Sequence, residues 1–374
     1  MLTPRVSVVF SGGVALGAYQ AGAYATLHDH EELRPRHLAG SSIGAVNAAL
    51  IAGNTMPKAV ETLKMFWDTV ALEPPGFVPW FCYAGHWPSK HAYSWLSVLH
   101  ARLSGRAGVF YPRLPALMFG AATSVYDLSP LGTQLEEFID FKRLNDGLVR
   151  VSVVTTDVET GDAVVFDTAR GDYIGPNHLL ASCGFLPDFS PIEINGRLLG
   201  DGGLSANTPV EAVLDQTAEE GAHICFLLDL FSPAGHRPRT LEDAAARRWD
   251  LLFGSQTRRV LKRVEREHRL RSDLDRIAGK LPPEAVHHPE IASLLEKVKS
   301  SALIVLHLSY RAPAHEAGPE KAFDFSRASL EHRWHAGAAD MAEAVRVATD
   351  ARPYNKGLYP HHFFSPELAP TVSP

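Results

Sequence analysis

The first 54 residues alternate short apolar runs with glycine turns and helical stretches, and this alternation constrains the fold more than any other feature. Residues 6–10 have the composition and length of a buried strand, and residues 14–28 carry small and apolar side chains at helical spacing. Residues 36–39 and 43–51 repeat the same order of strand and helix. Strands joined by helices run parallel, and the helices cover the sheet. The sequence therefore predicts an α/β fold built on a parallel sheet.

The rest of the chain adds strands and helices to this plan. Thr208-Pro209-Val210-Glu211 matches a capping box with proline at the first helical position, which predicts a helix start. The tail after Arg352 is rich in proline and histidine and is expected to be irregular. Strands are expected at residues 151–156, 163–167, 223–230 and 301–310, the first two as a hairpin, and helices at 129–138, 241–280 and 330–345.

Composition excludes several classes of protein. The 374 residues are 45% hydrophobic with a net charge of -6, so no basic field points to nucleic acid. Cys82, Cys183 and Cys225 are few, odd in number and far apart, which fits a reducing compartment. No apolar stretch reaches the roughly 18 residues of a membrane span, and the first strand is wrongly flanked for a signal peptide. The histidines show no metal-ligand spacing, and we expect a soluble cytoplasmic protein.

The turn Gly40-Ser41-Ser42-Ile43-Gly44 carries the strongest chemical signal. A serine hydroxyl is a poor nucleophile unless a base takes its proton, and it must be presented where a carbonyl can reach it. The Gly-x-Ser-x-Gly pattern does this by placing serine on a tight corner between a strand and a helix. Ser42 meets the pattern with both flanking elements, whereas Ser41 lacks glycines at the right offsets. Ser42 is therefore the predicted nucleophile.

Two further glycine-rich turns supply the other parts of a hydrolase site. Gly12, Gly13 and Val14 lie between the first strand and its helix, where backbone N–H groups meet developing negative charge. This turn lacks the lysine of a Walker A loop and the spaced glycines of a dinucleotide site, and a tight turn without a ligand is the alternative. Asp201, between Gly200 and Gly202, presents a carboxylate that can act as a base, although Asp-Gly-Gly turns are common in loops.

Together these motifs resemble the patatin-like phospholipases, and specifically their soluble bacterial branch. The resemblance extends through residues 126–131, residues 181–191, and residues 323–340, which are similar to a C-terminal extension of bacterial members. It implies a three-layer α/β/α sandwich with a Ser42–Asp201 dyad and an oxyanion hole at Gly12, Gly13 and Val14. It implies no metal and no organic cofactor. The positions that support these motifs are Gly17, Gly40, Gly44, Gly202 and Gly203.

The chain departs from the family pattern in the first turn. The third consecutive glycine of the family is Val14 here, so a positive φ at that position would be unfavourable. Ala15 and Leu16 stand where eukaryotic members often have arginine or lysine, which removes one contact to a phosphate headgroup. We expect Asp201 to be desolvated, with its pKa raised toward neutral.

The resemblance also implies a division of the chain. Residues 1–232 are expected to form the catalytic domain, and residues 233–374 a C-terminal helical extension with one further strand on the core. Residues 57–125, crowded with aromatic residues and prolines, suit an insertion or lid over an apolar cleft. A packed helical excursion without a functional role is the equal alternative.

Three other functions remain possible from the sequence. A Ser-His-Asp esterase would take its base from a histidine after Asp201, although Ser42 lies unusually early in the chain for that fold. A non-catalytic lipid-binding protein on the same fold is favoured by Val14 alone. A nucleotide-binding module would leave the Ser42 turn unexplained. The histidines in question are His223, His268, His307 and His332.

The substrate is less defined than the chemistry. The aromatic insertion suggests a long acyl chain, and the predicted reaction is phospholipase A or lipase-type hydrolysis of a fatty-acyl ester. Phospholipid, triglyceride, lysolipid, acyl thioester and stored polyester all remain open. The arginine-rich residues 247–271 suit peripheral contact with an anionic membrane, but interleaved acids favour a solvated helix face.

Overall fold

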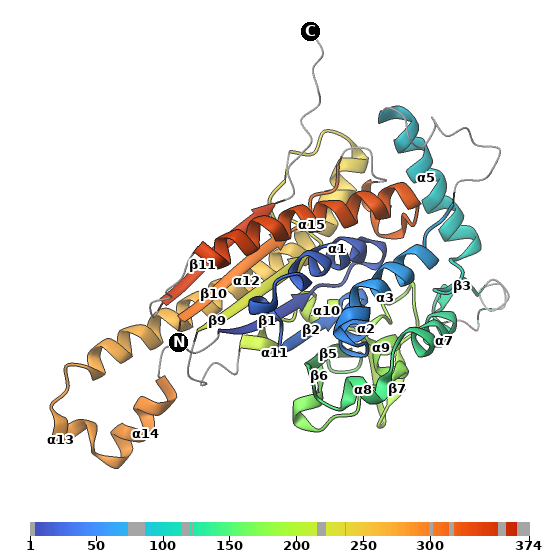
Figure 1. The fold of residues 1–374 in the computed structure, drawn as a ribbon. Helices are drawn as coiled ribbons and strands as arrows, with labels where there is room; N and C mark the ends of the chain where they lie inside the picture. Colours follow the sequence, from blue (N-terminus) through green and yellow to red (C-terminus); the bar gives the residue numbers. More distant parts are fainter. Residues whose placement is uncertain are drawn as a thin grey trace, which may run out of the picture.

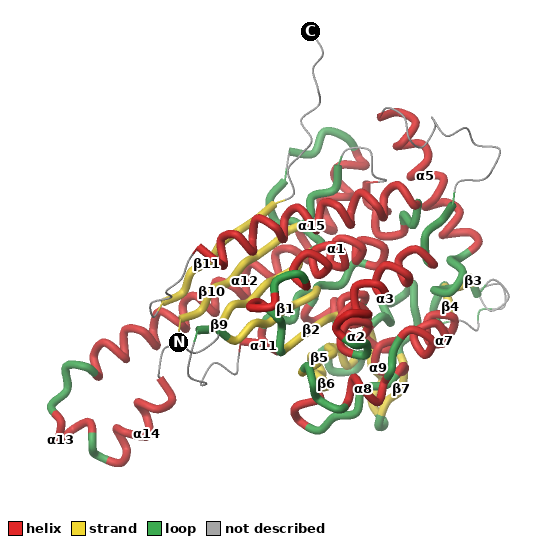
Figure 2. Tube along the Cα trace, viewed as in Figure 1, coloured by secondary structure: helices red, strands yellow, loops and turns green. Residues whose placement is uncertain are grey.

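The computed structural model describes residues 4–73, 87–113, 120, 123–214, 222–235, 237–298, 302–313, 318–350 and 357–364. Figures 1 and 2 show a twisted sheet with helices on both faces. The sheet order is β11-β10-β9-β1-β2-β5-β8-β7, with β6 beside β5. The strands are β1 (Arg5–Phe10), β2 (His37–Ser41), β5 (Arg150–Asp157), β6 (Ala163–Asp167), β7 (Ile192–Ile194), β8 (Arg197–Asp201), β9 (His223–Asp229), β10 (Ala302–Ser309) and β11 (Gly357–Phe364).

Strand direction confirms the predicted sheet. The pairs β11–β10, β10–β9, β9–β1, β1–β2 and β2–β5 are all parallel. The predicted hairpin is β5 with β6, which pair antiparallel, and β8 and β7 add an antiparallel edge. A separate ribbon pairs β3 (Tyr111–Pro112) with β4 (Tyr126–Asp127).

The helices form two layers, one on each face of the sheet. The layer in front of the sheet in Figure 1 contains α1, α2, α3 and α15, and α12 lies behind it. The α-helices are α1 (Gly17–His28), α2 (Ile43–Ala52), α3 (Met56–Thr69), α5 (Trp87–Ser104), α7 (Ser129–Phe138), α8 (Phe141–Asn145), α9 (Pro176–Ser182), α10 (Gly203–Ala206), α11 (Glu211–Leu214), α12 (Leu241–Ala278), α13 (Pro283–Val286), α14 (Pro289–Val298) and α15 (Arg327–Asp350). Short 3₁₀ turns are η1 (Val14–Leu16), η2 (Glu31–Leu33), η3 (Thr168–Arg170) and η4 (Gly318–Phe323). The three-layer α/β/α sandwich is therefore confirmed.

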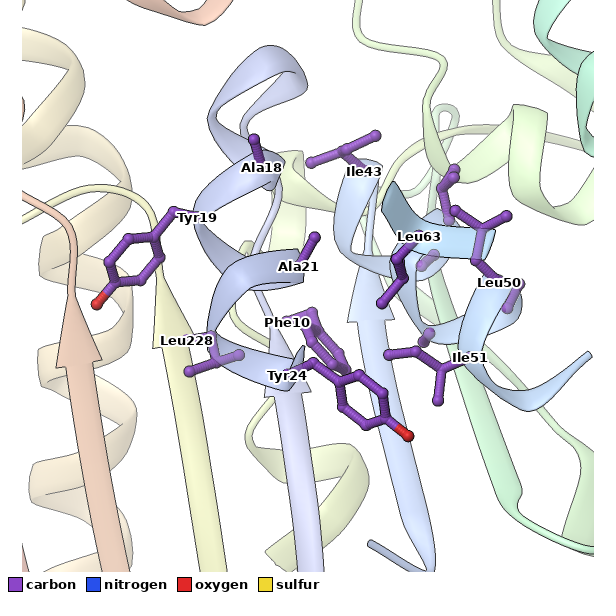
Figure 3. Close-up of a cluster of buried hydrophobic side chains, with 14 of the residues drawn as sticks. Phe10, Ala18, Tyr19, Ala21, Tyr24, Ile43, Leu50, Ile51, Leu63 and Leu228 are labelled. Carbon is purple, nitrogen blue, oxygen red and sulfur yellow. The ribbon is translucent and has the colours of Figure 1, made fainter. Parts of the chain in front are cut away.

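The main core lies between the sheet and the front helix layer. Figure 3 shows Phe10 of β1 and Tyr24 of α1 close together, with Ile51 of α2 and Leu63 of α3 nearby. A smaller core on the other face packs Val9, Cys225 and Leu227 against α11 and α12. Both faces of the parallel strands are thus covered, which is why most of their residues are apolar and do not alternate with exposed polar ones.

Helix α15 crosses α1 with backbone against backbone. A Cβ atom at Gly337 would overlap the carbonyl oxygen of Tyr19, and one at Gly22 would overlap that of Trp334. Side chains reinforce the crossing, because the Tyr19 hydroxyl donates to Asp340 at 2.6 Å. Residues on both sides of position 232 therefore share one sheet and one helix pair.

Two local predictions are wrong. The tail contains β11, which pairs parallel with β10, although the proline-rich sequence predicted irregular chain. An edge strand tolerates proline because one side of its backbone needs no partner. The capping box is absent, since the Thr208 hydroxyl accepts a hydrogen bond from the Thr257 hydroxyl at 2.9 Å, and α11 begins only at Glu211.

Buried polar side chains form hydrogen bonds near the beginning of the parallel strands. His37 Nε2 lies 2.8 Å from the Ser152 hydroxyl, which donates to Asp167 at 2.8 Å. Arg150 pairs with the same carboxylate at 2.6 Å. On β9, His223 Nε2 lies 2.8 Å from the Ser7 hydroxyl. Burial lowers the pKa of both histidines to about 3, and nearby arginines add to the effect.

These histidines predict loss of stability in acid. Their folded pKa lies below the unfolded value near 6.5, so stability is complete above pH 6.5 and falls as the pH drops toward 3. Each buried histidine contributes about 1.4 kcal/mol per pH unit in that range. Urea unfolding between pH 7 and 4 should give a clearly flatter slope for His37→Asn/His223→Asn than for wild type. The exposed His335→Asn serves as control, and an unchanged slope in the double variant would contradict the prediction.

Candidate active site

Ser42 lies at the corner between β2 and α2 in a strained backbone conformation. Its φ is 56° and its ψ is -130°, which is rare for a residue with a side chain and typical of functional sites. Gly40 and Gly44 make the corner possible, because a Cβ atom at either position would overlap backbone atoms of Ala45 or Phe10. The local geometry is that of a nucleophile elbow.

Ser182, at the end of α9, holds this corner in place. Its hydroxyl accepts a hydrogen bond from the Ser42 N–H at 2.9 Å and donates one to the Val154 carbonyl at 2.6 Å. The side chain is completely buried, so both bonds form away from water. Sequence reasoning missed this role, although Ser182 lies in the stretch 181–191 that carries the family resemblance.

Asp201 ends β8 directly beside Ser42. The Ser42 hydroxyl is placed to hydrogen-bond its carboxylate, and the Gly203 N–H donates to Oδ1 at 2.6 Å. Burial raises the pKa of Asp201 to about 7, against the lowering effect of these two hydrogen bonds. Gly202 lies against Val154 and Gly203 begins α10, so both allow close approach of the backbone. The expected neutral-range carboxylate is present.

Two other nucleophilic side chains lie close by. The Ser41 hydroxyl is buried and has no hydrogen-bond partner within the described part of the chain, so no base activates it. Cys183 lies near both Ser42 and Asp201, but burial and the Asp201 charge raise the pKa of its thiol far above the ordinary value. A protonated thiol is a weak nucleophile, which leaves Ser42, beside the Asp201 carboxylate, as the candidate nucleophile.

The glycine turn differs from the predicted oxyanion hole in one position. The Gly12 N–H donates to the Asn207 carbonyl at 3.1 Å and is therefore occupied. The N–H groups of Gly13 and Val14 remain as candidates. Val14 adopts a φ of 49°, so the left-handed conformation is kept with a β-branched residue, at a cost on the order of 1–3 kcal/mol. Gly17, the first residue of α1, packs against Ile43 and Trp67.

The four histidines of the alternative mechanism lie away from Ser42. Within the described chain, none of His223, His268, His307 and His332 lines the pocket that contains Ser42. His223 is near the start of β9, at the opposite end of the strands from Ser42, and His307 lies 3.4 Å from Asp229. The structure therefore places Asp201, and not one of these four histidines, in the pocket with Ser42.

An apolar pocket of about 120 Å³ opens above Ser42 and Asp201. An apolar cavity of roughly 150 Å³ holds one benzene molecule, so this pocket matches a short segment of an acyl chain. Leu128 and Leu131 of the N-terminal part and Trp249 and Phe253 of α12 all line it. Other lining residues include Val109, Phe185, Phe189, Phe231 and Phe323. Of the expected insertion 57–125, Arg102 and Val109 line the pocket, while residues 74–86 and 114–119 lie outside the described chain.

Arg102 of α5 joins three segments at the pocket wall. Its guanidinium pairs with Asp188 and with Glu320 of η4, each at 2.7 Å. It also lies 3.6 Å from the centre of the Phe323 ring, a cation–π contact. Burial lowers the pKa of Arg102, but hydrogen bonding with Tyr126, the hydrogen bonds donated to Glu320 and the nearby carboxylates outweigh it and raise the pKa overall. Ion pairs, as well as apolar packing, therefore hold this part of the pocket wall in place.

Comparison with known proteins places these features in one family. Residues 8–214 match the family described as patatin-like phospholipase, which is more than half of the chain. The chain belongs to the patatin-like phospholipase family. Residues 251–356 match a second family, described as patatin phospholipase, and this range contains most of α12 and all of η4 and α15.

Individual relatives of this patatin-like phospholipase are distant. A 66-residue stretch is 36% identical to triacylglycerol lipase SDP1L of Arabidopsis thaliana and covers 18% of this chain and 8% of that protein. The crystal structure of VipD from Legionella pneumophila gives a TM-score of 0.39 at 13% identity, covering 92% of this chain and 67% of VipD. The ExoU–SpcU complex of Pseudomonas aeruginosa gives 0.32 at 15% identity, covering 94% and 73%.

The described residues contain neither a metal-binding cluster nor a membrane-spanning helix. No group of three or more histidine, cysteine, aspartate or glutamate side chains is arranged to hold a metal ion there. No helix in the same residues is long and apolar enough to cross a membrane.

Proposed function

We propose that this chain is a serine acyl-ester hydrolase with Ser42 as nucleophile and Asp201 as base. The observation that carries the proposal is that Ser42, on a strained corner, and the buried carboxylate of Asp201 line the same apolar pocket, with the serine side chain acting on the carboxylate. A base with a pKa near the working pH combines ionisation with enough proton affinity to accept the serine proton. Family membership supports the same chemistry.

The proposed reaction has two halves. The Ser42 oxygen attacks the ester carbonyl while Asp201 takes its proton, and the N–H groups of Gly13 and Val14 stabilise the oxyanion. Collapse breaks the bond to the alcohol, which leaves with the proton from Asp201. Water then attacks the acyl-serine, Asp201 takes a proton from this water, and the fatty acid leaves as Ser42 recovers its hydrogen.

The pocket favours a fatty-acyl ester as the substrate. Its aromatic and aliphatic walls match an acyl chain, and its small volume holds only the part nearest the ester. A longer chain must extend beyond the wall formed by Arg102 and Glu320. The glycine turn supplies no cationic side chain for a headgroup, so we assign selectivity to the acyl part of the substrate.

A fluorophosphonate probe tests the nucleophile directly. Wild-type protein should be labelled, with the probe located on Ser42 by mass spectrometry, because an activated serine reacts with this electrophile. Ser42→Ala should abolish labelling, and Ser41→Ala, the adjacent serine without a base, should retain it. Absence of labelling in folded wild-type protein would instead support a non-catalytic lipid-binding protein.

The pKa of Asp201 predicts the pH dependence of the reaction. Only the ionised carboxylate can accept the serine proton, so kcat/KM should rise about tenfold per pH unit below pH 7 and level off above it. Initial rates on a dissolved short-chain ester between pH 5.5 and 9 measure this profile. A midpoint near 4, the ordinary value of a carboxyl group, would show that Asp201 is not the titrating base.

Contact with an anionic membrane through α12 is a second, weaker proposal. The helix is rich in arginine, but several of these side chains pair with acids, such as Arg269 with Glu265 and Arg271 with Glu267. Such pairing reduces the charge that a membrane would meet. Any binding through α12 should therefore be weak and sensitive to salt.

A further inference from the structure

Helix α5 buries two serines on its inner face, beside Tyr93, Val98 and Ala101, and exposes a row of leucines. Ser94 and Ser97 point into the protein and are buried, while Leu96, Leu99 and Leu103 are 59%, 53% and 65% exposed. Buried hydroxyls and an exposed leucine row are the informative exceptions to ordinary burial. The inner face is fixed, because the Ser94 hydroxyl donates to Asp324 at 2.7 Å.

The exposed leucines form one continuous stripe. Positions 96, 99 and 103 fall on one face of the helix and span about 10 Å along its axis. Trp95, 36% exposed, borders the stripe, and Figure 1 shows α5 at the upper right margin of the molecule. A contiguous exposed apolar patch of this kind marks an interaction site.

The stripe adjoins the substrate pocket. Arg102 and Glu320 line the pocket above Ser42, and the same two residues line a shallow groove with Leu96 and Leu99 on the outer side. The pocket wall is therefore also the edge of the apolar stripe. An acyl chain too long for the pocket would leave it beside these leucines.

We infer that the stripe Leu96–Leu99–Leu103 docks this protein on the surface of a phospholipid bilayer, with the pocket above Ser42 beside the membrane. The identification of a lipid surface rests on the proposed function, since the acyl substrate must leave such a surface. The 18 residues of α5 contain no aspartate or glutamate, so no carboxylate of the helix opposes lipid phosphates. Leucine and tryptophan on one face are typical of helices that lie in the membrane interface.

This docking differs from electrostatic binding in its response to salt. Binding through apolar side chains involves no charges that salt can screen. Binding to phosphatidylcholine vesicles should therefore persist from 0.1 to 1 M NaCl. Release of the wild-type protein by salt, or binding only to vesicles that contain phosphatidylserine, would overturn the inference in favour of α12.

A matched pair of variants tests the stripe. Leu96→Ser/Leu99→Ser should lower vesicle partitioning at least tenfold in sedimentation, and turnover of a long-chain ester in vesicles should fall with it. Turnover of a dissolved short-chain ester should stay within about twofold, which also shows that the variant is folded. The control is Leu270→Ser/Leu274→Ser, two leucines of α12 that are 55% and 46% exposed and lie away from the pocket.

The remaining outcomes separate the inference from the proposed function. Unchanged partitioning of the α5 variant, or equal loss in the α12 control, overturns the docking surface. A lipid-free wild-type dimer that the α5 substitutions convert to a monomer would assign the stripe to a second copy of this chain. Vesicle binding by wild type without turnover of either ester would support the docking surface and contradict the hydrolase proposal.

Discussion

Asp201→Asn should lower kcat by roughly 1,000-fold on any ester that the wild type hydrolyses, with little change in KM. The amide keeps the shape of the carboxylate and can still accept the hydrogen bond from the Gly203 N–H. It cannot accept a proton from Ser42 at any accessible pH. The residual rate should no longer show a midpoint near pH 7.

The same substitution should stabilise the protein in mild alkali. Burial raises the pKa of Asp201 from 3.8 to about 7, so the folded state holds a proton that the unfolded chain releases. Stability therefore falls as the pH rises from about 4 to 7, by about 4 kcal/mol in total. Removing the charge should restore part of this free energy at pH 8, measured by urea unfolding.

Asp157→Asn is the matched control for both effects. Asp157 ends the neighbouring strand β5, and a hydrogen bond from Arg197 lowers its pKa. Replacing the Asp157 carboxylate with an amide should therefore reduce the free energy of unfolding at pH 8 and leave kcat unchanged. If Asp201→Asn instead loses stability and keeps the wild-type rate, Asp201 is a structural carboxylate and the proposed dyad is wrong.

Gly337→Ala should destabilise the whole molecule by about 3 kcal/mol. The new methyl group would overlap the Tyr19 carbonyl oxygen, which is backbone and cannot move aside as a side chain can. Helix α15 must then shift from α1 and strain the bond between Tyr19 and Asp340. Because α1 continues from the glycine turn beside Ser42, we expect the rate to fall as well.

The control for this substitution is Gly279→Ala at the end of α12. A Cβ atom there would meet its nearest neighbours at 3.7 and 3.8 Å, which is ordinary contact, and φ is -65°. Its free energy of unfolding should change little, since no backbone has to move. If Gly337→Ala and Gly279→Ala have equal thermal denaturation midpoints, α1 and α15 can move apart without loss of stability, and the prediction is wrong.

The sequence alone was enough to predict candidate site residues that lie in short glycine-containing turns. Ser42 lies in a turn that needs two glycines four positions apart, and Asp201 lies between glycines for a similar reason. The parallel strands could be predicted because both of their faces are buried and most of their residues are apolar. These signals are short and continuous, so no knowledge of distant contacts was needed.

Contacts between distant segments could not be predicted in the same way. Nothing local indicates that the Gly12 N–H pairs with the Asn207 carbonyl, or that Ser182 accepts from Ser42. From the sequence, Trp249 and Phe253 belong only to a predicted arginine-rich helix. They line the pocket because of the way α12 packs against the rest of the protein. The capping box failed for a related reason, because Thr257 of α12 engages the Thr208 hydroxyl.

The crossing of α1 and α15 has a consequence for the life of the chain in the cell. On the ribosome, Ser42 and Asp201 are made before Trp249, Phe253 and Phe323 of the pocket wall and before α15, the helix that packs on α1. About 150 residues separate Asp201 from the end of α15, which is on the order of 10 to 30 s of synthesis. A nascent chain therefore carries Ser42 and Asp201 without a complete pocket, and if the proposed function holds, we expect ester hydrolysis only after α15 has emerged.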